Sequence, residues 1–174
     1  MPVRWGAFLT AVDRALARRV ELHCLGGFVL EVLYRRPVPT VDIDCIAVEP
    51  HAALSRLLEL AGAGSPLARQ HKVHFQFVTV ADVPDQYESR LLELFPQRFT
   101  RLQLRALEVH DLILAKLTRN HPIDERDVQF LAEAGVLDPA TLAERYRREL
   151  RPDLANQERH DLTLKLWLED YFSR

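Results

Sequence analysis

Hydrophobic and polar positions follow two different periods along the chain. Residues 5–19 place apolar side chains three or four positions apart, which predicts an amphipathic helix. Residues 20–25, 41–48 and 72–80 are short runs of apolar, β-branched and aromatic side chains, which are typical of strands. Residues 98–106 alternate apolar and polar side chains and predict an edge strand.

Helical patterns separate and follow these strands. The expected helices are residues 28–34, 51–60, 84–94, 108–119, 123–134, 139–150 and 157–172. Strands and helices therefore alternate in the first part of the chain, and helices alone complete it. This order predicts an α/β (α+β) fold: a core with a small mixed sheet over residues 1–106 and a C-terminal helical region over residues 107–174, packed on the core.

Composition and charge narrow the class of protein. The chain has 174 residues, of which 48% are hydrophobic and 28% charged, so a buried core is expected and the composition argues against disorder. The formal charge of −2 shows no bulk basic character, although a local basic surface is compatible with it. Cys24 and Cys45 form no CxxC pair, which argues against a structural zinc site. The first residues lack the apolar centre of a signal peptide and no run suits a membrane span, so we expect a cytoplasmic protein.

Two aspartates inside an apolar strand are the central chemical feature. Asp42 and Asp44 are two residues apart, so on a strand they point to the same face. Two ionised carboxylates so close repel each other unless a cation or water screens them. Mg²⁺, or Mn²⁺, suits such a pair because it takes hard oxygen ligands and substrate phosphates. The alternative is that these aspartates begin an exposed strand, but Ile43 and Cys45 indicate burial.

A glycine pair precedes these aspartates. Gly26 and Gly27 follow the strand at residues 20–25 and open a helix. Glycine lets the backbone approach a ligand closely, and a helix N-terminus favours anions. The pair alone is more often a simple turn, but its position one short helix before the two aspartates is typical of a phosphate-binding site.

The stretch LGGFVLEVLYRRPVPTVDIDCIAV resembles the signature of the polymerase β-like nucleotidyltransferase superfamily. It is most similar to small bacterial nucleotidyltransferase-like proteins related to type IV abortive-infection toxins, where a threonine commonly stands at the position of Thr40. A second stretch, HDLILAKLTRN followed by DERDVQFL, resembles a helical segment of that group. Its matched positions are Asp111, Lys116, Arg126 and Asp127.

This resemblance implies transfer of a nucleoside monophosphate from a nucleoside triphosphate (NTP) to a hydroxyl of RNA, such as a tRNA 3′ end, or of a protein. Asp42 and Asp44 would then be catalytic and bind the metal. The residues expected to contact the nucleotide are Gly26, Gly27, Arg36, Thr40 and Gln76. Lys116 would neutralise triphosphate charge, or alternatively form a salt bridge on its helix. For Asp111 and Asp127 we favour a structural role, orienting Lys116 and Arg126.

The sequence departs from the pattern of this superfamily at two positions. Active members usually carry a third carboxylate on a neighbouring strand, where KVHFQFVTV offers only Gln76, with Asp82 just beyond it. Relatives often carry an arginine at the position of Val38, and Arg35 and Arg36 are the nearby replacements. A fold of this type that binds a nucleotide, RNA or protein without catalysis is therefore the alternative function. His74 is read as an ordinary core histidine.

Two further features bear on partners. A basic run near the end of one helix, formed by Arg145, Arg147, Arg148 and Arg151, is the candidate RNA-contacting patch. Trp167, Tyr171 and Phe172 have roughly helical spacing, so they pack the last helix onto the body of the protein or onto a second copy in a homodimer.

Overall fold

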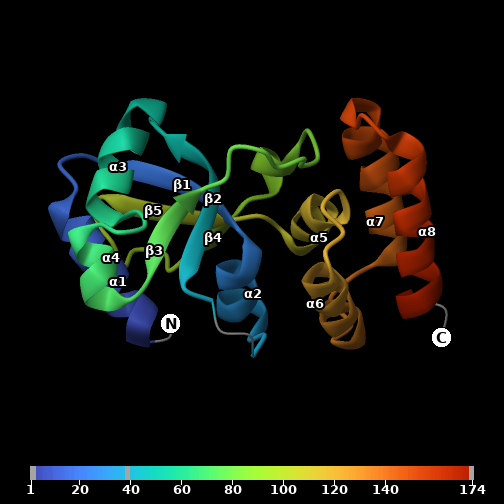
Figure 1. Cartoon of the computed structure of the whole chain (residues 1–174), viewed down its shortest axis with the longest axis horizontal. Helices are drawn as coiled ribbons and strands as arrows, with labels where there is room; N and C mark the ends of the chain where they lie inside the picture. Colours follow the sequence, from blue (N-terminus) through green and yellow to red (C-terminus); the bar gives the residue numbers. More distant parts are fainter. Residues whose placement is uncertain (1–2, 38–39, 173–174) are drawn as a thin grey trace. The chain divides into compact units, whose positions relative to one another are not determined.

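A computed structural model describes residues 3–37 and 40–172, and within them it confirms the α/β (α+β) class (Figure 1). The α-helices are α1 (Val3–Ala15), α2 (Gly26–Tyr34), α3 (Leu54–Ala61), α4 (Pro66–His71), α5 (Val109–Leu117), α6 (Pro122–Glu133), α7 (Pro139–Arg145) and α8 (Gln157–Phe172). The strands are β1 (Val20–Leu25), β2 (Asp42–Glu49), β3 (His74–Phe77), β4 (Leu92–Leu94) and β5 (Leu102–Ala106). Single turns of other helix types are η1 (His51–Ala53), η2 (Tyr87–Arg90), η3 (Tyr146–Leu150, a π-helix) and η4 (Arg151–Asp153).

The five strands form one mixed sheet in the order β3-β2-β1-β5-β4. Strand β1 pairs antiparallel with β2 and parallel with β5, while β2 pairs parallel with β3 and β4 pairs antiparallel with β5. The prediction of an edge strand at residues 98–106 was therefore wrong, because β5 lies inside the sheet between β1 and β4. The edges are β3 and β4.

Residues 84–94 also differ from the helix expected there. The structure has the short turn η2 followed by β4, whose Leu92 and Leu94 pair with Ala106 and Leu104 of β5. The local pattern suits a helix, but ladder hydrogen bonds to a strand ten residues further on decide the conformation.

The chain divides into two compact units. The sheet unit contains residues 1–79 and 91–107, and the helical unit contains residues 80–90 and 108–174. The chain therefore leaves the sheet unit after Thr79, returns for β4 and β5, and leaves it again after Leu107.

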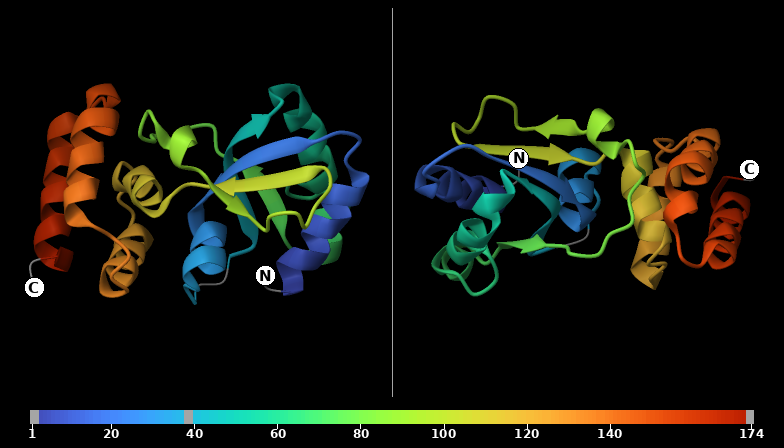
Figure 2. Two further views of the ribbon diagram at one scale, coloured as in Figure 1. Left: turned by 180° about the vertical axis from the view of Figure 1, so that it is seen from behind. Right: turned by 90° about the horizontal axis from the view of Figure 1, so that it is seen from above.

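The core of the sheet unit lies on one face of the sheet. Fully or almost fully buried side chains alternate along the strands of this face: Leu22, Cys24, Ile43, Cys45, Phe75 and Leu104. Helices α1, α3 and α4 gather against it (Figure 2), and the rings of Phe8 and Phe75 lie 5.3 Å apart. Because successive strand residues point to opposite faces, Asp42 and Asp44 belong to the other face.

Within the helical unit, charged groups gather around a fully buried carboxylate, Asp111 of α5. Arg90 binds both oxygens of Asp111, at 2.8 and 3.0 Å, and also Glu149 at 2.6 Å. Arg145 donates to Asp111 at 3.0 Å and to Glu108 at 2.5 Å. These paired and hydrogen-bonded charges fix residues 80–90 to the helices of this unit.

Candidate active site

The strand β2 places Asp42 and Asp44 side by side on the face of the sheet away from the buried core. Both are partly exposed. Ile43, which lies between them, and Cys45, which follows Asp44, are fully buried. Asp44 lies opposite Leu25, the last residue of β1, and beside Gln76 of β3. The aspartate pair is thus flanked on one side by the strand that leads into the glycine turn and on the other by Gln76.

Both the backbone conformation and the space available at position 26 require glycine. The φ of Gly26, +76°, lies in the left-handed region, and a Cβ placed on it would collide with the carboxylate of Asp44, whose Cγ would be only 3.3 Å away. Any other residue would be strained and would displace Asp44. The turn therefore brings the backbone into direct contact with the aspartate.

Thr40 connects Gly27 to the other aspartate. A Cβ on Gly27 would lie 3.1 Å from the Cβ of Thr40, so the glycine allows the two segments to pack closely. The hydroxyl of Thr40 donates a hydrogen bond to Oδ1 of Asp42. Thr40 therefore orients the first aspartate while it packs against the turn.

The first turn of α2 is free of competing acids. This helix has nine residues, begins at Gly26 and has neither an acidic residue in its first turn nor a side-chain cap at Leu25. Its unsatisfied N–H groups and the positive end of its dipole make an anion site, which suits phosphate.

The two cysteines take no part in this chemistry. Burial, and to a smaller extent the charge of Asp44, raises the pKa of the Cys45 thiol to about 12. Burial is also the main reason why the pKa of Cys24 is raised well above its ordinary value. Both thiols are therefore protonated at neutral pH, so neither is activated as a nucleophile.

Asp42 and Asp44 supply a donor set that fits Mg²⁺. In the part of the chain that the structure describes, no cluster of three or more His, Cys, Asp or Glu side chains is arranged to hold a metal ion. A cation at this aspartate pair would take its remaining ligands from the amide oxygen of Gln76, from water and from substrate phosphates. Mg²⁺ is commonly held in this way, by one or two carboxylates and the phosphates of its substrate.

The structure also gives the positions of His74 and Arg36. His74 lies in register with Asp42 and is partly exposed, so it borders the candidate site, a placement that the reading as a core histidine missed. Alternation along the strand puts His74 on the same face as Gln76, and the parallel pairing of β2 with β3 sets it beside Asp42. Arg36 is buried, at 9% exposed, and follows the C-terminal end of α2, whereas the glycine turn is at the other end of this helix; Val38 lies outside the described residues.

Lys116 belongs to the helical unit and is buried. Its Nζ donates to Asp124 at 3.0 Å and forms an ion pair with Asp127 at 2.7 Å. The role of Asp127 as an ion-pair partner of Lys116 agrees with these contacts, whereas Asp111 pairs with Arg90 and Arg145. These contacts favour a structural role for Lys116.

The basic run of the helical unit is partly neutralised. Arg145 is bound to Glu108 and Asp111, and Arg151 to both oxygens of Asp161. Arg147 and Arg148 are exposed. Only part of the run therefore presents charge to solvent.

A strand, a glycine turn at a helix N-terminus and two carboxylates on the adjacent strand define a protein of the nucleotidyltransferase type. The chain belongs to the family described as a nucleotidyltransferase of unknown function (DUF6036), whose profile matches residues 12–172. Nucleotidyl transfer is therefore the general activity that this family membership supports. Searches of curated proteins and of solved structures gave no match. Among residues 3–37 and 40–172, no helix has the length and apolar character needed to cross a membrane.

Proposed function

We propose that the protein is an Mg²⁺-dependent nucleotidyltransferase that moves a nucleoside monophosphate from an NTP to a hydroxyl of an RNA or protein acceptor. The observation that carries this proposal is the contact between the glycine turn and the aspartates: a Cβ on Gly26 would occupy the place of the Asp44 carboxylate. A phosphate bound by the turn would therefore lie beside the metal-binding carboxylates.

Each residue around the turn has a proposed task. Asp42 and Asp44 hold Mg²⁺, or Mn²⁺, which when bound neutralises triphosphate charge and stabilises the attacking and leaving oxygens. The backbone N–H groups at Gly26 and Gly27 bind phosphate oxygens. Thr40 keeps Asp42 oriented through its hydrogen bond. Gln76 supplies a neutral oxygen at the position where relatives carry an acid, and Arg36 adds positive charge near the nucleotide.

These residues position the reaction rather than form a bond themselves. The acceptor hydroxyl attacks the α-phosphorus of the NTP in line with the leaving pyrophosphate, and the turn holds the triphosphate so that this line is kept. A kinship with type IV abortive-infection toxins stays a prediction from the resemblance, as does the identity of the acceptor.

A second candidate function is binding of a nucleotide, RNA or protein without catalysis. The observation behind it is Gln76, which lies in register with Asp44 where active relatives have a carboxylate. A neutral ligand there would weaken the metal site, because it brings no charge.

Calorimetry of NTP binding with and without Mg²⁺ tests the proposal. We expect wild type to bind NTP only with Mg²⁺, and Asp42→Asn/Asp44→Asn to lose this binding. Glu49→Gln is the matched control, since Glu49 is an exposed acid at the far end of the same strand. Transfer of a labelled monophosphate to RNA or protein then separates the two functions, and absence of NTP binding by folded wild type contradicts both the metal site and the transferase.

A further inference from the structure

Two connecting segments lie side by side at the end of the sheet unit where β1 begins. One links α1 to β1, and the other, residues 95–101, links β4 to β5. Val20 and Leu102 are paired at the start of the parallel strands β1 and β5. The guanidinium of Arg101 donates to the carbonyl of Leu16 at 3.0 Å, and Arg19 donates to Gln103.

These two segments present a concentration of arginines. We call this surface the arginine end; its residues are Arg18, Arg19, Arg98 and Arg101 of the two segments and Arg14 of the last turn of α1, all exposed. Residues 13–20 and 95–101 contain a single acid, Asp13. Its Oδ1 accepts hydrogen bonds from the backbone N–H groups of Arg101 at 2.6 Å and Leu102 at 2.8 Å, so it serves the fold. A net charge of −2 for the whole chain therefore hides a segregated basic surface.

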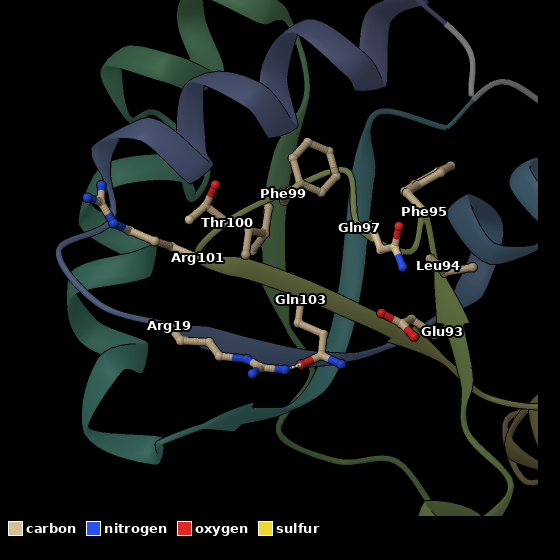
Figure 3. A pocket seen from close by; sticks show the side chains of 10 residues that line it. Arg19, Glu93, Leu94, Phe95, Gln97, Phe99, Thr100, Arg101 and Gln103 are labelled. Atoms are coloured by element: carbon tan, nitrogen blue, oxygen red, sulfur yellow. Dashed lines mark hydrogen bonds between the residues drawn. The ribbon is translucent and has the colours of Figure 1, made fainter.

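The same surface contains a hollow with two aromatic rings. The hollow has a volume of about 250 Å³ and is lined by both segments, including Phe95, Phe99 and Arg19, and by one exposed acid of β4, Glu93. The rings of Phe95 and Phe99 are perpendicular, with centroids 6.4 Å apart, and both are partly exposed. Figure 3 shows them above β5, with Arg19 reaching along the strand to Gln103.

The β4–β5 segment holds an unusual backbone conformation. Phe95 and Gln97 have φ values of 53° and 60°, a left-handed conformation that non-glycine residues adopt rarely. Asp13 fixes the end of the segment through the two backbone bonds described above. The aromatic rings therefore sit on a segment whose shape is set by its surroundings.

We infer that the arginine end docks a single strand of nucleic acid. Its arginines can bind the negatively charged phosphates of a flexible strand. Its aromatic rings offer faces on which unpaired bases stack. The hollow beside Arg147 in the helical unit lacks this combination, because the aromatic ring among its described lining residues, Tyr146, is buried.

This inference rests on the proposed function, in which the strand is the acceptor. β1 runs from Val20 at the arginine end to Leu25 at the glycine turn, a path of about 17 Å for six strand residues. The arginine end would therefore bind a part of the acceptor strand that is distant from the reacting hydroxyl.

Fluorescence anisotropy with labelled 12-nucleotide RNA and DNA of the same mixed sequence tests the inference. At 0.1 M salt we expect Arg18→Gln/Arg98→Gln to bind about tenfold or more weakly than wild type, with a shallower dependence on salt. Phe99→Leu should weaken binding about five- to hundredfold, through lost stacking. Arg147→Gln/Arg148→Gln removes the same charge from the helical unit and should bind like wild type. A preference for RNA or for DNA identifies which strand is used, and binding of either supports the inference.

Three results would overturn it. One is equal binding by wild type and Arg18→Gln/Arg98→Gln, and another is equal binding by wild type and Phe99→Leu. The third is tighter binding of polyglutamate, a polyanion without bases, which would point to an acidic protein partner. Thermal unfolding confirms that each variant is folded. Asp42→Asn/Asp44→Asn should keep strand binding while it loses NTP, so failure of the docking surface and failure of the NTP site are observed separately.

Discussion

At the scale of single residues, local spacing predicted the shared face of Asp42 and Asp44 and the place of Gln76, but not the place of His74 beside Asp42. Spacing alone placed Asp42 and Asp44 on one face, because strand residues two apart share a face. Alternation along β3 also pointed to Gln76 as the third position, and the register sets it beside Asp44. The place of His74 beside Asp42 depends on how two strands pair, which local sequence does not encode.

Gly26→Ala should both destabilise the protein and abolish NTP binding. A left-handed conformation costs an alanine about 1–2 kcal/mol, and its Cβ would displace the Asp44 carboxylate. Gly64→Ala is a close control, since Gly64 has a φ of +77° but nothing within 4 Å of the added Cβ. Urea denaturation should show a similar backbone cost for both, while calorimetry should show loss of NTP binding only for Gly26→Ala. Equal NTP binding by the two variants would contradict the contact with Asp44.

Thr40→Val should weaken metal-dependent NTP binding without unfolding the protein. Valine keeps the methyl group that packs near Gly27 and replaces the hydroxyl with a second methyl group, which removes the hydrogen bond to Asp42. A bond to a charged group is worth about 1.5–3 kcal/mol, so the affinity should fall roughly tenfold or more. Thr40→Ser keeps the hydroxyl and should bind like wild type in the same calorimetry. If valine and serine bind equally well, Thr40 does not position Asp42.

At the scale of elements, the strongly patterned helices and central strands were predicted well, and residues 84–94 were not. The strand expected over residues 98–106 is present as β5, but inside the sheet and not at its edge. The helical pattern of residues 84–94 is real locally, but Leu92 and Leu94 complete an antiparallel ladder with β5. Helix α4 was missed because it has only six residues, although Ser65 caps it and Pro66 begins it. Short elements depend on partners distant in the chain, so local periodicity identifies them poorly.

Lys116→Met should lower the free energy of unfolding by about 3–5 kcal/mol. The substitution leaves Asp127 and the fully buried Asp124 with one cation fewer, and an unbalanced buried charge is costly. Lys165→Met is the control, since Lys165 is exposed and its ion pair with Glu169 spans 3.8 Å. Chemical denaturation measures the difference. Unchanged stability together with lost NTP binding would instead support direct contact of Lys116 with the triphosphate.

At the scale of the whole molecule, ion pairs with long sequence separation determine which segments belong together. Arg90 joins residues 80–90 to Asp111 and Glu149, although composition gives no sign of such partners. The switch to helices near residue 107 was visible in the sequence, because it is a change of local period. The assignment of residues 80–90 to the helical unit was not visible, because it rests on single charged groups.

Acid should destabilise the protein through the carboxylates of the helical unit. Burial alone would raise the pKa of Glu108, but bonds from His110 and Arg145 outweigh it and lower the pKa from 4.5 to about 2. Bonds from Arg151 and Tyr146 likewise lower the pKa of Asp161 to about 2. The stability that these ionised groups contribute is therefore complete above about pH 4.5 and is lost as the pH falls through 2.

The urea midpoint measured from pH 6 to pH 2 checks this expectation. Wild type should lose stability progressively in the acid range, and Glu108→Gln should show a shallower decrease, because it has no carboxylate to protonate. Glu144→Gln, at an exposed position of α7, should follow wild type. Identical curves for wild type and Glu108→Gln would show that Glu108 carries none of the acid sensitivity.

The interleaving of the two units has a consequence for how the protein is made. A ribosome releases the chain from its N-terminus, and the sheet is incomplete until β5, which pairs with β1, has emerged. Residues 80–90 emerge before that point. Glu149, the partner of Arg90, is made 59 residues after Arg90. The sheet unit is complete once residue 107 has emerged, with residues 80–90 as an insertion, whereas the helical unit needs residues made after that point. The order of synthesis therefore favours closure of the sheet first. Arg90 can pair with Glu149 only after η3 has been made.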